Sequence, residues 1–144
     1  PVDFKNPRSI NHQKLFDKLK IGKIKYFEYS ENIKNHFNNS SCLILPSYRE
    51  GCSKAIMEAM TFGLPVITTN VPGCEENIKK SKSGIICKVK SVKSLENSIK
   101  KFANLPISNK KVMSKNAVNY SIKNFNENKI VQKYLDVIKL INKK

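Results

Sequence analysis

The chain has 144 residues, of which 40% are hydrophobic and 26% charged, a composition typical of a globular domain with its own core. No apolar run approaches the roughly 20 residues of a membrane-spanning helix, and the first residues lack the apolar segment of a signal peptide. The formal net charge of +16 comes almost entirely from Lys, with Arg only at Arg8 and Arg49. Three interpretations of this charge stay open: solubility, attraction to an anionic membrane or lipid phosphate, and nucleic-acid binding.

Predicted strands and helices alternate as far as about residue 90. The first elements are a helix over 10–19, a strand over 24–29 and a short helix that ends near 38, with Ile33 and Phe37 on its inner face. The apolar run 42–45 follows, and such a run is typical of a parallel strand that is buried on both faces. A sheet of parallel strands is therefore expected from the first half of the chain.

The second half continues this pattern and then becomes helical. We expect a helix over 54–62 closed by Gly63, a strand over 64–69, one or two helical turns over 74–80 and a strand over 85–89. Helices follow from 91, one of them capped by Ser108. A last helix over 127–141 is predicted to pack inward through Ile130, Val131, Tyr134, Leu135, Ile138 and Ile141.

These elements predict one α/β domain over residues 1–144: a Rossmann-like parallel sheet flanked by helices, with strand and helix alternating over 1–90 and helices over 91–144. In such a sheet, ligands bind beyond the carboxyl ends of the strands. Three segments are expected to converge there: Tyr29–Ser30, Ser47–Lys54 and Asn70–Glu76.

The stretch from Ser47 to Met60 has the strongest functional pattern: a strand end, a polar turn and a helix N-terminus. Unpaired N–H groups and about half a positive charge make a helix N-terminus suitable for a phosphate. A carboxylate at Glu58, one turn into the helix, is able to accept both hydrogen bonds of a ribose diol. Glu50 in the turn is able to approach a sugar hydroxyl or a developing charge. The alternative for each is a solvated Glu near a helix start.

Three neighbours of Glu50 also bear on this site. Lys54 opposes the helix dipole at a cost of a few tenths of a kcal/mol, which a bound phosphate would offset. Gly51 allows close approach of a ligand or a positive φ. Cys52 is interpreted as a small side chain in the turn, because no His stands nearby to activate it. The four Cys residues lack zinc-ligand spacing, and reduced thiols in a cytosolic protein are expected.

Residues 42–69 resemble the C-terminal domain of the GT4 family of retaining glycosyltransferases. They contain Pro-Ser-Tyr-Arg-Glu-Gly, then Glu-Ala-Met and Gly-Leu-Pro-Val-Ile, which match the family pattern P-S-x-x-E-G, E-A-M and G-x-P-V-I. The segment Val71–Ile78 is similar to the family's G-x-x-E-x-I segment, with Glu75 where many members carry Arg. The resemblance implies a GT-B architecture of two Rossmann-like domains with the active site in the cleft between them. The C-terminal domain would bind the nucleotide-sugar donor, and the N-terminal domain, which would precede Pro1, would bind the acceptor.

The resemblance also implies roles for single residues. Glu58 would bond the nucleotide ribose, and Glu50 would be the catalytic residue that contacts the donor sugar. The remaining donor-binding positions would be Gly51, Cys52, Ser53, Lys54 and Tyr29. The implied reaction is transfer, with retention, from a UDP- or GDP-linked sugar to a saccharide or lipid-linked acceptor, with no metal and no cofactor.

Measured against the family pattern, the chain is expected to be the truncated donor-binding part of a longer enzyme. The family's phosphate-gripping Arg and Lys would precede Pro1, and so would two strands. The isolated chain is therefore expected to be inactive, and its exposed strand edges to favour dimerisation. The expected location is the cytoplasm, peripheral at the inner face of the membrane, in polysaccharide assembly. A basic nucleic-acid-binding α/β module and a non-catalytic nucleotide-binding scaffold stay open as alternatives.

Overall fold

The computed structural model describes residues 24–27 and 30–141, so the predicted helix 10–19 and Tyr29 lie outside the described residues. The chain divides into two units, with the boundary between Ile33 and Lys34, and the strands of the sheet belong to the second unit. In the first unit, the described residues 24–27 are not part of a strand, so the prediction there is wrong. Alternation of apolar and polar side chains makes a strand possible, but a strand forms only where a neighbouring strand pairs with it.

The described sheet has three parallel strands, β1 (Leu43–Leu45), β2 (Val66–Thr69) and β3 (Gly84–Cys87), in the order β1-β2-β3. Ile67 lies opposite Ile44 on one side and opposite Ile85 on the other. All four residues of β2 are buried. By contrast, Ile44 of β1 is 40% exposed, so β1, an edge strand of the described sheet, is not buried on both faces. The prediction that the apolar run 42–45 is buried on both faces is therefore wrong for β1.

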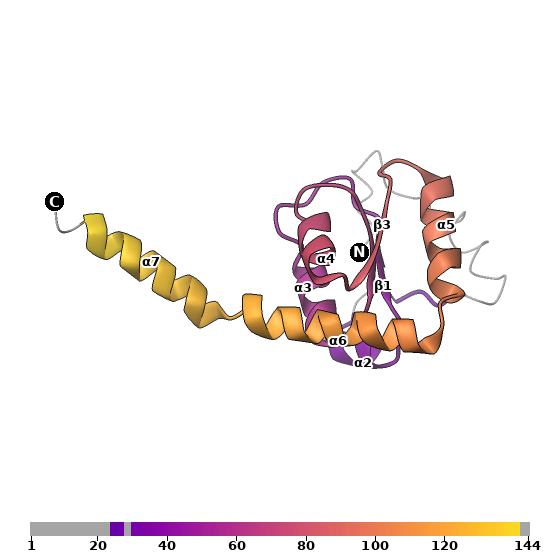
Figure 1. Cartoon of the computed structure of the whole chain (residues 1–144), viewed down its shortest axis with the longest axis horizontal. Helices are drawn as coiled ribbons and strands as arrows, with labels where there is room; N and C mark the ends of the chain where they lie inside the picture. The colour runs from indigo at the N-terminus through magenta and orange to yellow at the C-terminus, as the bar shows by residue number, and fades with distance from the viewer. Residues whose placement is uncertain (1–23, 28–29, 142–144) are drawn as a thin grey trace. The chain divides into compact units, whose positions relative to one another are not determined.

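Helices cover both faces of this sheet (Figure 1). Helices α3 (Lys54–Thr61) and α4 (Glu75–Ser81) lie on one side and α5 (Val92–Ala103) on the other. The α3 side chains that face inward occur at helical spacing, and Gly63, at φ 70°, ends the helix region as predicted. The buried apolar core comprises Phe37, Ile56, Ala59, Met60, Leu64, Val66, Val71, Cys74, Ile78 and Ala117.

The remaining helices confirm most predicted bounds and correct some details. In α2 (Ile33–Asn38), Phe37 is buried against Phe62, with ring centroids 5.6 Å apart, but Ile33 is 45% exposed rather than inward. Helix α6 (Ile107–Asn124) has Pro106 as its N-cap residue, not Ser108. Proline suits a helix start because its missing N–H would have no intrahelical partner there.

Helix α7 (Glu127–Ile141) has the predicted bounds, but the side chains described on its predicted inward face, which leave out Ile130, are exposed. Periodicity shows that a face is apolar without showing what covers it. The exposed apolar side chains of α7 are Val131, Tyr134, Leu135, Val137, Ile138, Leu140 and Ile141. Among the described helices, none has both the length and the apolar character required to cross a bilayer.

Gly73 allows two loops at the carboxyl ends of the strands to pack closely. Its φ is +80°, and a Cβ built there would lie 2.4 Å from the carbonyl oxygen of Glu50. Gly51, in the facing turn, differs on both counts: its φ is not positive, contrary to one expectation for it, and a Cβ would meet nothing within 4 Å. The loop therefore tolerates no side chain at Gly73, whereas the turn has open space at Gly51.

We expect Gly73→Ala to lower the free energy of unfolding by at least about 1–3 kcal/mol, because the new Cβ adds backbone strain and a clash with Glu50. Gly51→Ala is the control and should change it by less than about 1 kcal/mol. Urea unfolding followed by circular dichroism measures both. Equal stability of the two variants would contradict the close packing of these loops.

Candidate functional site at the carboxyl ends of the strands

The turn between β1 and α3 is held in place by hydroxyl groups of β2. Thr68 donates from Oγ1 to the carbonyl oxygen of Leu45 at 2.9 Å, and Thr69 donates from Oγ1 to the carbonyl oxygen of Ser47 at 2.5 Å. Both Thr side chains are buried. Carbonyl groups that leave the end of a strand need new partners, and these two receive them from the neighbouring strand. The start of the turn is therefore fixed to the centre of the sheet.

Glu50 is oriented by a side chain of the same turn. The Ser47 hydroxyl donates to Oε1 of Glu50 at 2.6 Å, and Glu50 is half-buried. A hydrogen bond to a carboxylate is shorter and stronger than one between neutral groups, so it limits the carboxylate to few orientations. Sequence reasoning missed this role of Ser47, although the Ser and the Glu of one short motif were the available signal.

The loop after β2 joins the turn through the backbone. The Ser53 N–H donates to the carbonyl oxygen of Gly73 at 3.2 Å, and the Gly73 N–H donates to Oε2 of Glu76 at 2.9 Å. Of the three segments predicted to converge, the two that follow β1 and β2 therefore do meet. Tyr29, in the other segment, lies outside the described residues.

Ser53 differs from its neighbours because its hydroxyl and its N–H both form hydrogen bonds within the protein. It is buried, and its hydroxyl oxygen accepts from the Ile56 N–H at 3.5 Å as the N-cap of α3. Its own N–H is used by Gly73, so neither group is free to hold a diphosphate. Within the described residues, the N–H groups of Cys52 and Lys54 have no such partner. Of the predicted phosphate-binding N–H groups, those of Cys52 and Lys54 are therefore available to a ligand, whereas that of Ser53 is not.

Glu58 lies one turn into α3, at the wall of a cavity. Its Oε1 is 3.7 Å from Nζ of Lys54, and the two side chains are 38% and 85% exposed. Such an exposed ion pair contributes little stability, so a ligand can replace it at small cost. The cavity has a volume of about 570 Å³ and is lined by Cys52, Lys54, Met57, Glu58, Thr61, Asn77, Asn124 and Phe125.

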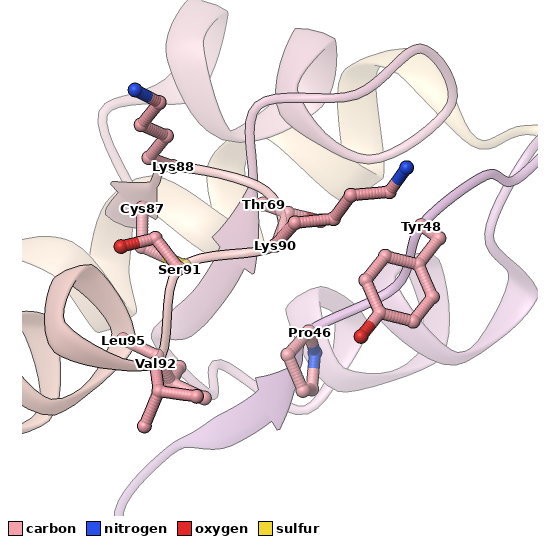
Figure 2. A pocket seen from close by; sticks show the side chains of 9 residues that line it. All are labelled: Pro46, Tyr48, Thr69, Cys87, Lys88, Lys90, Ser91, Val92 and Leu95. Carbon is pink, nitrogen blue, oxygen red and sulfur yellow. The ribbon is translucent and has the colours of Figure 1, made fainter.

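A second, smaller pocket opens at the carboxyl ends of all three strands (Figure 2). Its volume is about 240 Å³, and we call it the strand-end pocket. Tyr48 of the β1–α3 turn lines one side and the loop from Lys88 to Ser91, after β3, lines the other (Figure 2). The pocket is lined by Pro46, Tyr48, Thr69, Cys87, Lys88, Lys90, Ser91, Val92 and Leu95.

The four cysteines are all free, and they differ in accessibility. Burial raises the pKa of the thiols of Cys42, Cys74 and Cys87, which keeps them protonated and unreactive. Cys52, in the turn between β1 and α3, is exposed, and its Sγ lies 3.7 Å from Sδ of Met57. Within the described residues, no group of three His, Cys, Asp or Glu side chains is placed to hold a metal ion.

Comparison with known proteins places this arrangement in a family. The model of the family described as "Glycosyl transferases group 1" matches residues 7–120. An α-1,3-N-acetylgalactosaminyltransferase from Campylobacter jejuni, named for N,N'-diacetylbacillosaminyl-diphospho-undecaprenol, is 29% identical over 81% of this chain and 31% of its own length. The Escherichia coli UDP-Gal:α-D-GlcNAc-diphosphoundecaprenol α-1,3-galactosyltransferase is 31% identical over 76% of this chain and 28% of its own.

A solved structure agrees with these relatives. A glycosyltransferase from Rickettsia africae superimposes with a TM-score of 0.81 and 27% identity, over 92% of this chain and 36% of the other. The chain thus spans about a third of the length of the relatives it matches. The predicted α/β fold and the resemblance to the C-terminal domain of a GT-B glycosyltransferase are confirmed. The chain belongs to the glycosyl transferases group 1 family.

Proposed function

We propose that the protein to which this chain belongs transfers a sugar from a nucleotide-sugar donor to a saccharide or lipid-linked acceptor, and that this chain binds the donor. The observation that carries the proposal is the placement of Glu50 in the turn and Glu58 one helical turn beyond the N-terminus of α3. The family and the names of the relatives support it over a nucleic-acid-binding module. A non-catalytic scaffold would have no need of a carboxylate oriented as Glu50 is.

The donor would lie along the turn. Glu58 would accept the hydroxyl hydrogens of the ribose, the N–H groups of Cys52 and Lys54 would hold the diphosphate, and Glu50 would contact the sugar. In the reaction, the bond from the sugar's anomeric carbon to the diphosphate oxygen breaks, and the electron pair leaves with the nucleoside diphosphate. A bond from the same carbon to an acceptor hydroxyl oxygen forms, and the hydroxyl proton passes to the departing phosphate. Positive groups at the helix N-terminus would stabilise the charge that develops there.

The lipid-linked acceptors in the names of the relatives support a location at the inner face of the membrane. Both bacterial relatives are named for a diphosphoundecaprenol acceptor, and a sugar carried on such a lipid is reached at a membrane surface. A formal net charge of +16 would attract the protein to anionic lipid head groups. Peripheral attachment of a cytoplasmic protein is therefore part of the proposal, and dimerisation through strand edges stays a prediction.

The first test measures nucleotide binding to the full-length protein by calorimetry with UDP and GDP. We expect saturable binding of one of them, and a loss of about tenfold in affinity in Glu58→Ala because two hydrogen bonds to the ribose disappear. Glu96→Ala is the matched control, since Glu96 also pairs with a Lys four residues away on an exposed helix face. Binding of duplex DNA with a steep salt dependence, and of neither nucleotide, would overturn the proposal.

Alkylation of Cys52 provides a second test. Iodoacetamide followed by mass spectrometry should label Cys52 first, because it is exposed whereas burial raises the pKa of the thiols of Cys42, Cys74 and Cys87. The bound nucleoside diphosphate should slow this labelling several-fold, because the N–H groups proposed to hold the diphosphate belong to Cys52 and Lys54. Cys52→Ser should lack the fast reaction. Labelling of Cys52 at the same rate with and without bound diphosphate would place the phosphates elsewhere.

A double-mutant cycle tests whether Ser47 acts through Glu50. Ser47→Ala should lower the affinity for the sugar nucleotide about tenfold relative to that for the bare nucleoside diphosphate, and Ser47→Thr should retain it. Adding Ser47→Ala to Glu50→Gln should cause no further loss, since the hydroxyl would act only by orienting the carboxylate. Losses that multiply in the double variant would mean that Ser47 contributes by another route.

A further inference from the structure

A groove lies between α5 and β3, apart from the proposed donor site, and we call it the α5 groove. Its volume is about 440 Å³, and the apolar part of its lining consists of Ile85 and Ile86 of β3. The rest is polar and comes from α5 and its N-cap residue, on the other side of the sheet from α3 and α4 (Figure 1). The α5 groove shares no lining residue with the cavity beside Glu58, so it is a separate candidate for ligand binding.

Serine hydroxyls form much of this polar lining. Ser91, Ser94 and Ser98 are spaced by three and four residues, so they lie on one face of the helix. The Ser91 oxygen accepts from the Ser94 N–H at 3.2 Å, and the Ser94 oxygen accepts from the Lys88 N–H at 2.9 Å. A hydroxyl that accepts in this way still has a proton to donate, and no described residue accepts one from Ser91 or Ser94. Both hydroxyls are therefore able to donate to a ligand in the α5 groove.

Ser98 is the buried serine of this set. It is only 8% exposed, and its hydroxyl has no hydrogen-bond partner among the described residues. By contrast, Ser121 of α6, which is 4% exposed, donates to the carbonyl oxygen of Val118 at 2.8 Å. A buried hydroxyl without a partner is uncommon, because the hydrogen bonds that it makes with water are lost and not replaced. Since Ser98 lines the α5 groove, a ligand in the groove is able to be that partner.

Lysine side chains add positive charge to the same lining. Lys101 forms no ion pair with any residue in the described part of the chain. Lys93 pairs with Glu96 at 3.3 Å, but Glu96 also pairs with Lys100 at 2.5 Å, so one carboxylate serves two cations. The N-terminus of α5 contributes a further partial positive charge, and the lining contains no carboxylate. Hydroxyl donors combined with uncompensated positive charge favour an oxyanion over a cation.

We propose that the α5 groove binds a phosphate group, carried by a soluble phosphate compound or by a lipid head group. The hydroxyls of Ser94 and Ser98 donate to the phosphate oxygens, and the ammonium group of Lys101 balances their charge. The groove is larger than a phosphate group, so it has room for part of the molecule that carries the phosphate. This site goes beyond the proposed donor function and does not depend on it, because none of these residues lines the cavity beside Glu58.

The test measures binding of inorganic phosphate to the full-length protein by equilibrium dialysis. Ser98→Ala should lower the affinity about tenfold, because a hydrogen bond to a charged group is lost. Ser121→Ala is the matched control and should leave the affinity unchanged, since the Ser121 hydroxyl bonds within its own helix. Lys101→Gln should weaken binding several-fold, whereas Lys115→Gln, which removes an exposed Lys of α6, should not.

Two further measurements separate a lost contact from a disturbed fold and identify the source of the phosphate. Without phosphate, Ser98→Ala should unfold at no lower urea concentration than the wild type, because the Ser98 hydroxyl has no described partner to lose. Vesicles that contain phosphatidylglycerol are then sedimented with each protein. Weaker sedimentation of Ser98→Ala than of the wild type assigns the phosphate to a lipid head group, and equal sedimentation assigns it to a soluble compound.

The α5 groove would lose its assignment if the wild type, Ser98→Ala and Lys101→Gln bound inorganic phosphate with equal affinity. Absence of saturable phosphate binding to the wild type would have the same meaning. Neither result bears on the proposed donor site, which is tested by the binding of UDP and GDP to Glu58→Ala. A failure of that nucleotide binding, in turn, would leave the phosphate site in the α5 groove unaffected.

Discussion

The site depends on the contact between the turn after β1 and the loop after β2. In a parallel sheet, backbone groups leave the pairing pattern at the strand ends, and buried ones must find other partners. Here Thr69 supplies a hydroxyl to the Ser47 carbonyl, and Gly73 lies so close to Glu50 that no side chain fits between them. The orientation of Glu50 is therefore determined by the neighbouring strand as much as by its own turn. A carboxylate on a free loop would lose more conformational entropy when it binds a sugar.

Sequence patterns predicted the elements of this fold where the periodicity was long or the turn residues were specific. Helices α3 and α7 and strand β2 lie within a residue or two of their predicted bounds, and Gly63 ends α3 with the positive φ expected of it. Apart from the strand predicted over 24–29, whose described residues 24–27 are not in a strand, the errors concern the surroundings of an element rather than its type. An apolar run such as 42–45 does not reveal whether a strand lies on each side of it, and an apolar stripe on α7 does not identify its partner.

The candidate site was predicted as a set of residue types but not as a set of bonds. The motif locates Glu50 and Glu58, because the family pattern that the sequence resembles has two glutamates at this spacing. The motif does not reveal that the Ser53 hydroxyl caps α3 and that the Ser53 N–H donates to Gly73. The second of these bonds depends on a loop that follows another strand. Tyr48 and Lys90 face one pocket for the same reason: the strands that carry them to one edge are distant in sequence.

Charge sets the remaining constraint on the proposed donor site. A leaving nucleoside diphosphate carries about two negative charges or more, whereas the N-terminus of α3 supplies only about half a positive charge. Lys54 adds one charge, but its side chain is 85% exposed, and it is shared with Glu58 at 3.7 Å. Solvent therefore weakens its effect on a phosphate. The N-terminus of α3 and Lys54 together therefore supply less positive charge than the leaving diphosphate carries. On the proposed function, further cations have to act on the diphosphate, and Arg49 of the same turn is one candidate among the described residues.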